Sequence, residues 1–169
     1  MLSIGKLDSV LTAQKARRVP VYVPLDRYAQ GLAPLDRLRA DTTVVVRNLR
    51  PAVDSLRQVK DAAELATLRR AIDITAEAHR QILATLEPGM FEYQTEAVLE
   101  GTFRRLGADR VGFPSIVGSG PNSTTLHYDV NRRRMNAGET VVVDVGAEYG
   151  QYTADVTRTY PVLGTFSPR

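Results

Sequence analysis

Cysteine is absent from this chain of 169 residues. Disulfides, thiolate nucleophiles and zinc sites built on sulfur are therefore excluded, and any metal ion must be held by oxygen or imidazole ligands. Histidine is also scarce, since only His79 and His127 are present. An imidazole ligand or base can come from no other position of this sequence.

Long apolar runs are missing too. No window approaches the roughly 18 consecutive apolar residues of a membrane-spanning helix, and the first residues lack the apolar centre of a signal peptide. Apolar residues make up 43% of the chain and charged residues 24%, which is typical of a soluble globular domain. We therefore expect a cytoplasmic protein with no membrane partner.

The excess of basic residues is small, with a formal net charge of +3. The basic clusters are scattered over the chain, with acidic residues between them: Arg17-Arg18, Arg69-Arg70, Arg104-Arg105 and Arg132–Arg134. Binding to nucleic acid favours a continuous basic stripe or interleaved aromatic residues, and neither is found. We expect no nucleic-acid partner, and we interpret the run Arg132–Arg134 as a solvated loop.

The first part of the chain shows little periodicity. Two short strand-like runs, over residues 20–24 and 42–46, stand among several prolines. The character of the sequence then changes near residues 50–60. We expect a small, incomplete N-terminal segment before the main domain.

A long amphipathic helix is predicted from Asp61 to Leu86. Asp61 as the N-cap and Glu64 three residues later form a variant of the capping box, and Pro88-Gly89 ends the pattern. The predicted apolar stripe, completed by one threonine and one histidine, comprises Leu65, Leu68, Ile72, Thr75, His79, Ile82 and Leu86.

A second helix is predicted over residues 92–106, where Gly107 stops it. A strand near residues 111–117 follows, and then the loop 118–122, which lacks the lysine of a phosphate-binding loop and is interpreted as a turn. A hairpin completes the pattern. Together these elements predict an α/β fold with two helices packed on a curved, mainly antiparallel sheet.

The predicted hairpin carries two aspartates, on the strand-like segments 140–146 and 152–160. If Tyr149-Gly150 is the two-residue turn, Asp144 faces Asp155 directly. Facing like charges destabilise a sheet unless a proton or a hard divalent cation lies between them. From the residues alone three possibilities remain: a metal site, a bulge that turns one aspartate to solvent, or two surface aspartates near a hairpin end.

The two histidines have different surroundings in the sequence. His79 falls on the apolar stripe of the first helix, where we expect a core imidazole bonded to a backbone or hydroxyl partner. His127 follows the glycine-rich loop, and such loops place side chains at the mouths of sites. From the residues alone, a loop-filling role and a functional role for His127 are equally open.

Residues 56–166 resemble the first half of the catalytic domain of the pita-bread metallopeptidases, most closely the aminopeptidase P branch. In that family a histidine lies 17 residues before the first aspartate ligand and the second aspartate lies 11 residues after it, as do His127, Asp144 and Asp155 here. The matching segments, in order, are Leu56–Lys60 with Glu64, Ala78-His79, Glu87–Gly89, Ser115–Val117, Leu126–Tyr128 with Asn131, Asp144–Tyr149 and Ala154–Val162.

The resemblance implies a pair of divalent ions, usually manganese, with Asp144 chelating one ion and Asp155 bridging both. A hydroxide held between the ions would attack the scissile carbonyl, and His127, as a catalytic residue, would contact the substrate or the tetrahedral intermediate. The implied substrate is a peptide with proline at its second position, from which the first residue is removed. Residues 1–55 would be a remnant of a creatinase-like N-terminal domain with a linker, and residues 56–169 the first half of the catalytic domain.

One departure from the family concerns the remaining ligands, a histidine and two glutamates in the second half of the domain. After Asp155 this sequence has no histidine and no acidic residue. We therefore expect a truncated chain that is catalytically incompetent alone and that associates with a second-half polypeptide or with another copy of itself. The alternatives are a non-catalytic peptide-binding or interaction module of the same fold and a prolidase-like dipeptidase.

Overall fold

The computed structural model describes residues 9–10, 12–14, 19–23, 36, 38 and 40–166. The chain divides into two compact units, Met1–Lys60 and Asp61–Arg169. In the first unit, strand β1 (Val21–Val23) pairs in parallel with β2 (Val46–Asn48). The strand predicted over residues 20–24 is thus confirmed at its centre.

The strand predicted over residues 42–46 is wrong in position. Residues 42–44 form a turn, because the Asp41 carboxylate accepts hydrogen bonds from both the backbone N–H and the hydroxyl of Thr43. Helix α3 (Arg50–Gln58), which begins with a proline in its first turn, then occupies a stretch where only a boundary was expected.

Helix α4 (Ala62–Thr85) begins at the predicted cap. The Asp61 side chain accepts from Glu64 N, and the Glu64 carboxylate accepts from Asp61 N, which completes the capping box. The predicted stripe is wrong in part, since Leu65 and Ile72 are 45% and 47% exposed. The buried face instead consists of Ala71, Ile74, Thr75, Ala78, His79 and Ile82. The two alanines and the threonine let the helix lie close to the sheet.

The second helix, α5 (Glu92–Arg105), is confirmed and ends before Gly107, which has a φ of +89°. The single strand predicted near residues 111–117 is two strands, β3 (Arg110–Val111) and β4 (Ile116–Ser119). Pro114 lies between them and has no N–H to donate to a ladder, so the strand is interrupted there. A 3₁₀ helix, η3 (Gly120–Thr124), follows β4.

The hairpin consists of β5 (Thr140–Val145), β6 (Ala147–Tyr149), β7 (Tyr152–Thr153) and β8 (Val156–Pro161). All pairs within the two three-stranded sheets, ordered β4-β5-β8 and β3-β6-β7, are antiparallel. The turn is Gly150-Gln151, not Tyr149-Gly150 as predicted, because Tyr149 pairs with Tyr152. Both turn residues have positive φ, +57° and +68°, as a type I′ turn requires.

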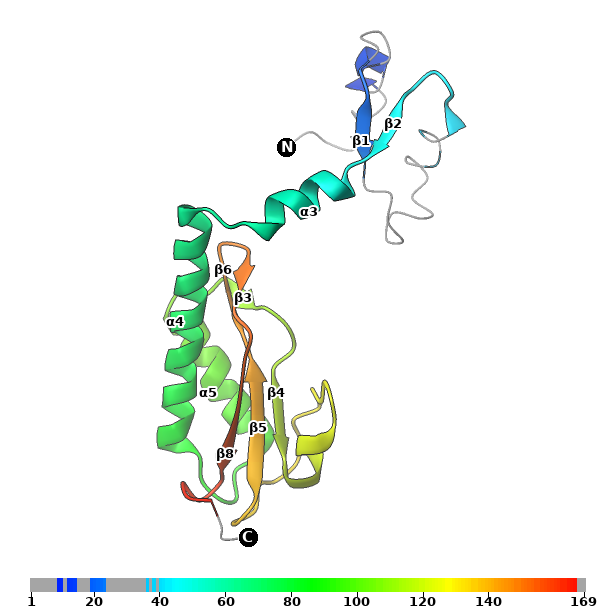
Figure 1. The fold of residues 1–169 in the computed structure, drawn as a ribbon. Coiled ribbons are helices and arrows are strands. Elements are labelled where there is room, and N and C mark those ends of the chain that lie inside the picture. The colour runs from blue at the N-terminus through cyan, green and yellow to red at the C-terminus, as the bar shows by residue number, and fades with distance from the viewer. Residues whose placement is uncertain are drawn as a thin grey trace. The chain divides into compact units, whose positions relative to one another are not determined.

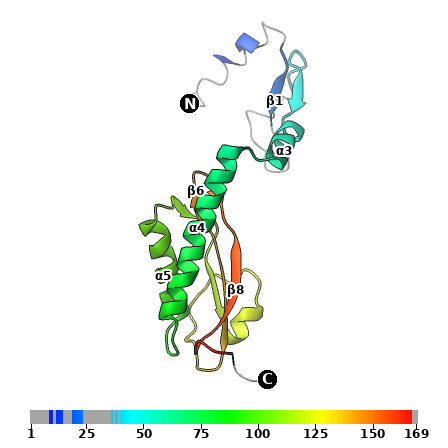
Figure 2. The ribbon, with the colours of Figure 1, turned by 60° about the vertical axis from the view of Figure 1, so that its left-hand side comes forward.

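Helices α4 and α5 pack beside one another on one face of these sheets (Figures 1 and 2). Along β5 the side chains alternate, so that Val141, Val143 and Val145 are fully buried in the core while Val142 and Asp144 point to the opposite face. The predicted architecture of two helices on an antiparallel sheet is confirmed. It also means that Asp144 lies on the face that the helices leave uncovered.

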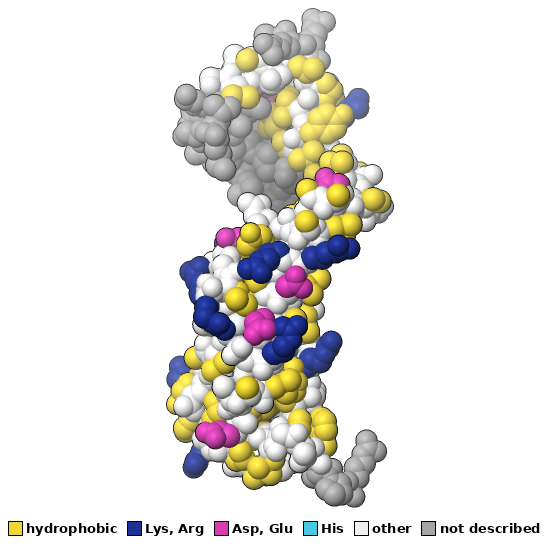
Figure 3. Space-filling view, turned by 90° about the vertical axis from the view of Figure 1, so that its left-hand side faces the viewer, with side chains coloured by type: hydrophobic (Ala, Val, Ile, Leu, Met, Phe, Trp, Pro, Cys, Tyr) yellow, Lys and Arg dark blue, Asp and Glu magenta, His cyan; other side chains and the backbone are white. Residues whose placement is uncertain are grey.

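The outer surface of α4 carries basic and acidic side chains next to one another (Figure 3). One such pair is Arg80 with Glu77, whose side chains are 2.6 Å apart. No helix in the described part of the chain is long and apolar enough to cross a membrane.

Candidate metal centre

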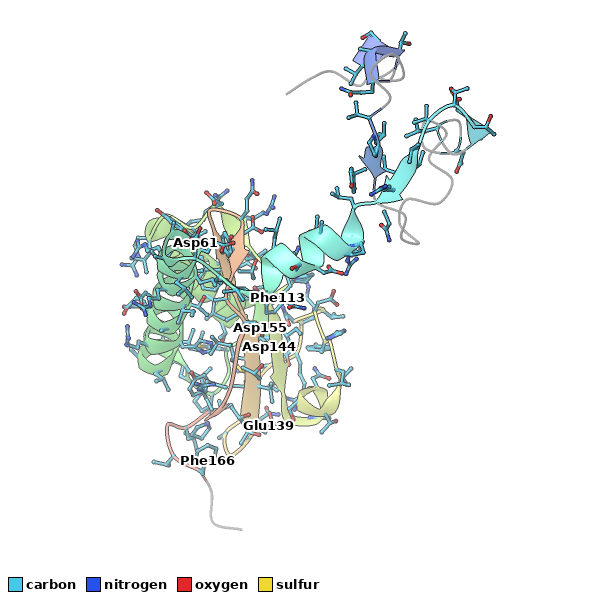
Figure 4. All side chains as sticks on the ribbon, turned by 45° about the horizontal axis from the view of Figure 1, so that its top comes forward. Asp61, Phe113, Glu139, Asp144, Asp155 and Phe166 are labelled. Atoms are coloured by element: carbon cyan, nitrogen blue, oxygen red, sulfur yellow. The ribbon has the colours of Figure 1, made fainter. Side chains whose placement is uncertain are left out.

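A pocket of about 340 Å³ brings the three predicted site residues together. It is lined by Phe113, Pro114, Ile116, His127, Asp129, Asp144 and Asp155. Asp144 comes from β5, Asp155 from the residue before β8, and His127 from the segment after η3. Figure 4 shows Asp144 and Asp155 beside each other, with Phe113 nearby.

The two aspartates are diagonal neighbours, not direct partners as the predicted register had them. Asp144 pairs with Thr157 on one side and with Ile116 on the other, and Asp155 lies two residues from Thr157. A shift of two residues leaves a side chain on the same face, so both carboxylates still point into the pocket. Diagonal neighbours lie roughly 7–8 Å apart, which leaves room for an ion between the carboxylates.

Asp144 carries an unpaired oxygen. Its Oδ1 is one of two buried side-chain atoms without a hydrogen-bond partner in the described residues, the other being Thr95 Oγ1. A buried acceptor without a donor costs about 1–3 kcal/mol, more when it is charged. A cation beside Asp144 would remove that cost, and a carboxylate pair is the hard oxygen donor set that Mn²⁺, Mg²⁺ and Ca²⁺ prefer. The residues present therefore fit a divalent metal ion.

The set of possible ligands is small. No group of three or more histidine, aspartate and glutamate side chains suited to hold a metal is found among the described residues. Asp144 and Asp155 thus form a platform of two carboxylates, and further ligands would come from water or from outside the described residues.

His79 is a core imidazole, as predicted. It is 6% exposed, with Nε2 3.2 Å from the Val156 carbonyl oxygen and Nδ1 2.9 Å from the Tyr160 hydroxyl. In the matching tautomer Nε2–H donates to Val156 and Nδ1 accepts from Tyr160. Burial lowers the pKa of His79 despite the Val156 hydrogen bond, which favours the neutral imidazole. Through its bonds to Val156 and Tyr160, His79 fastens β8 to α4 directly after Asp155.

His127 lies exposed at the rim of the pocket, in the left-handed backbone region with a φ of +53°. The next residue is held firmly, because the Tyr128 hydroxyl donates to Glu92 Oε2 at 2.7 Å. Asp129 also lines the pocket, although the sequence did not indicate it as a site residue. Its position two residues after His127 is the only signal in the sequence that could have indicated it.

The run Arg132–Arg134 is not the uniformly solvated loop that was expected. The Arg133 guanidinium donates to both Glu139 carboxylate oxygens, at 2.6 and 2.7 Å, and to Ser119 Oγ at 2.9 Å. These hydrogen bonds lower the pKa of Glu139 to about 2. Arg133 therefore links the chain segment that follows His127 to β4 and to the start of β5.

Comparisons with known proteins agree with this geometry. The model of metallopeptidase family M24 matches residues 66–169. An Xaa-Pro aminopeptidase of Escherichia coli strain K12 is 43% identical over 130 residues, which are 77% of this chain and 29% of that protein.

Solved structures of aminopeptidase P share the fold over nearly the whole chain. Proline aminopeptidase P II from Yersinia pestis has a TM-score of 0.87 at 35% identity, covering 99% of this chain and 41% of that one. Aminopeptidase P from E. coli with the inhibitor Pro-Leu has a TM-score of 0.86 at 35% identity, covering 98% and 40%. The chain thus spans less than half the length of these relatives. The resemblance in the sequence is confirmed, and the chain belongs to metallopeptidase family M24, with the pita-bread fold of aminopeptidase P.

Proposed function

We propose that the protein acts as an Xaa-Pro aminopeptidase, which removes the first residue from peptides with proline at the second position. The observation that carries the proposal is the convergence of His127, Asp144 and Asp155 on one pocket. The 43% identity to the E. coli Xaa-Pro aminopeptidase supports the same activity.

Asp144 and Asp155 would hold two divalent ions, and we propose manganese as the metal. The unpaired Oδ1 of Asp144 supports this role. When bound, such ions polarise a carbonyl group and make water a nucleophile at neutral pH.

The chain's own side chains would orient the peptide. His127 at the rim would donate a hydrogen bond to the substrate or to the tetrahedral intermediate. Phe113, Pro114 and Ile116 line the pocket beside the two aspartates and would exclude water from the scissile bond.

We further propose that residues 1–55 belong to a creatinase-like N-terminal domain with its linker, and residues 56–169 to the first half of the catalytic domain. In the described residues β8 pairs with β5 alone, so its other edge presents unpaired backbone groups. Such an edge suits pairing with a second-half polypeptide or with another copy of the chain. Light scattering at tens of micromolar tests this: a complex supports the proposal, and a strictly monomeric folded species contradicts it.

A second candidate is a non-catalytic peptide-binding module. It is favoured by one observation, that the described residues offer two carboxylates and no larger ligand cluster. A module of this kind would bind a peptide without cleaving it.

The decisive test is a cleavage assay with Mn²⁺, using the chain mixed with a polypeptide that supplies the second half of the E. coli relative's catalytic domain. Release of the first residue from an Xaa-Pro tripeptide, but not from its Xaa-Ala analogue, supports the proposal. Cleavage of the Xaa-Pro dipeptide alone indicates a prolidase-like enzyme. Peptide binding without cleavage indicates the non-catalytic module. The same assay is run on Asp144→Asn, which removes a proposed metal ligand. The matched control is Asp73→Asn, a substitution at an exposed position on α4.

A further inference from the structure

Among the described residues, the carboxylate outside the pocket that accepts the most hydrogen bonds is that of Glu92, at the start of α5. Its side chain is fully buried, and five donors surround it. Oε1 accepts from Ser119 N at 2.8 Å, Ser119 Oγ at 2.7 Å and Asn122 Nδ2 at 3.2 Å. Oε2 accepts from the Tyr128 hydroxyl at 2.7 Å and from Arg133 N at 2.9 Å.

These hydrogen bonds keep Glu92 ionised inside the protein. Burial acts to raise the pKa of its carboxyl, but the bonds from Ser119, Tyr128 and Arg133 outweigh burial and lower the pKa below its ordinary value. The position in the first turn of a helix also favours a negative charge. A carboxylate held in this way is a rigid anchor, since moving any donor away leaves a buried charge less well paired.

The donors lie at both ends of the segment that carries His127. Ser119 and Asn122 precede His127, whereas Tyr128 follows it directly and Arg133 closes the segment. Residues 119–133 form the His127 loop.

The His127 loop needs such an anchor, because its backbone is strained. His127 and Asn131 have φ values of +53° and +48°, a region that residues other than glycine rarely adopt. Leu126 beside His127 is 91% exposed and contributes little packing. Strained conformations persist only where the surrounding structure holds them.

Asn131 is a second attachment of the loop. It is fully buried, accepts from Val117 N at 3.0 Å and donates to the Ser115 carbonyl oxygen at 2.8 Å. Asn131 therefore fastens the loop to β4, four residues beyond His127. Near His127 itself, the bond between Tyr128 and Glu92 is the attachment.

We propose that Glu92 is the positioning residue for His127, because its carboxylate gathers both ends of the His127 loop and holds the imidazole at the rim of the pocket. The inference rests on the proposed function, in which His127 meets the substrate beside ions held by Asp144 and Asp155. Glu92 itself does not line the pocket and acts through Tyr128.

Two substitutions separate this role from general stability. In Glu92→Gln one oxygen becomes an NH₂ group, so the Tyr128 hydroxyl and Arg133 N lose their acceptor even if the other three donors keep theirs. Tyr128→Phe removes only the hydroxyl next to His127 and leaves four donors on Glu92. Tyr93→Phe, an exposed tyrosine of α5, is the matched control.

The experiment follows the Hε1 proton resonances of the two histidines during titration with Mn²⁺, which broadens signals near its binding site. In the wild type we expect the His127 signal to broaden strongly. In Glu92→Gln and Tyr128→Phe we expect at least a threefold smaller broadening, while Tyr93→Phe behaves as the wild type. Before Mn²⁺ is added, the chemical shift of His79, which is held by Val156 and Tyr160, reports in each variant whether the fold is intact.

A metal-free measurement completes the test. Exchange of the Arg133 amide, which donates to Glu92, is expected to be at least tenfold faster in Glu92→Gln than in the wild type. Unchanged exchange together with unchanged His127 broadening in folded variants would overturn the positioning role. If the His127 signal still broadens in the double variant Asp144→Asn, Asp155→Asn with Glu92 intact, the proposed metal site is wrong, and the Arg133 exchange alone then decides the role of Glu92. If Glu92→Gln unfolds, Tyr128→Phe carries the test.

Discussion

Gly146 and Ala154 lie in backbone contact, so close that a Cβ atom on Gly146 would stand 1.7 Å from the Ala154 carbonyl oxygen. Gly146 separates β5 from β6, and its own carbonyl oxygen accepts from Gly112 N at 2.8 Å. Asp144 lies two residues before Gly146, and Asp155 directly follows Ala154. This contact therefore sets the spacing of the two carboxylates.

Gly146→Ala is expected to destabilise the fold by about 2–4 kcal/mol, because the new methyl group meets backbone that cannot rotate away. The matched control is Gly101→Ala in α5, where a Cβ meets nothing within 4 Å. That change is expected to stabilise by about 0.5–1 kcal/mol, since alanine is the better helix former. Urea unfolding of the three chains measures both effects, and equal stability of the two variants would contradict the contact.

Asp144→Asn is expected to raise the free energy of unfolding of the metal-free chain by about 1 kcal/mol, because the unpaired Oδ1 then no longer belongs to a charged group. Asp155→Asn removes an exposed carboxylate and should leave this quantity unchanged. Both variants should lose any stabilisation by Mn²⁺. Urea unfolding of the wild type and both variants, with a chelator and with Mn²⁺, gives the six values. A wild type more stable than Asp144→Asn without metal would refute the explanation.

The 169 residues alone are expected to bind Mn²⁺ weakly, with a dissociation constant on the order of 10⁻⁴ M or weaker, because two carboxylates leave a hard cation mostly hydrated. They are also expected to leave Xaa-Pro peptides uncleaved. Calorimetric titration with Mn²⁺ measures the affinity. Submicromolar binding, or chelator-sensitive cleavage by the pure chain, would disprove this expectation.

The pair of Arg133 and Glu139 is expected to make stability depend on acid pH. Hydrogen bonds from Arg133 lower the pKa of Glu139 from 4.5 to about 2 in the folded chain. Because the folded state keeps this carboxylate ionised to lower pH than the unfolded chain does, its contribution is complete above about pH 4.5 and is lost as pH falls to about 2. Solvent screening of this partly exposed pair reduces the contribution to roughly 1–2 kcal/mol.

Glu139→Gln should accordingly be less stable than the wild type at pH 6, and the difference should vanish near pH 2. Urea unfolding of both chains across this range gives the difference directly, with the other carboxylates cancelling between them. A difference that stays constant with pH would show that Arg133 does not hold Glu139 ionised.

Features set by neighbouring residues could be predicted from the sequence. The cap of α4 is one, since Asp61 and Glu64 satisfy each other within one helical turn. The register of the hairpin could not be predicted, because Gly150 fits a two-residue turn with either Tyr149 or Gln151. Only the structure shows Gln151 with positive φ, which carries no signature in the sequence.

Only those site residues that have a characteristic spacing along the chain could be predicted from the sequence. The spacing of His127, Asp144 and Asp155 indicated three residues that do line one pocket. Glu92, by contrast, looks in the sequence like an ordinary acidic residue at the start of a helix. Its burial depends on donors 27 to 41 residues further along the chain, which no local pattern reveals.

The alternation along β5 has a consequence for how the sheet is assembled. A slip of one residue would turn Asp144 into the apolar core and Val141, Val143 and Val145 outward. Burying an unpaired carboxylate in such surroundings costs several kcal/mol, in addition to the apolar burial that the three valines would lose. Asp144, the proposed metal ligand, thus also disfavours misaligned hairpins while the chain folds.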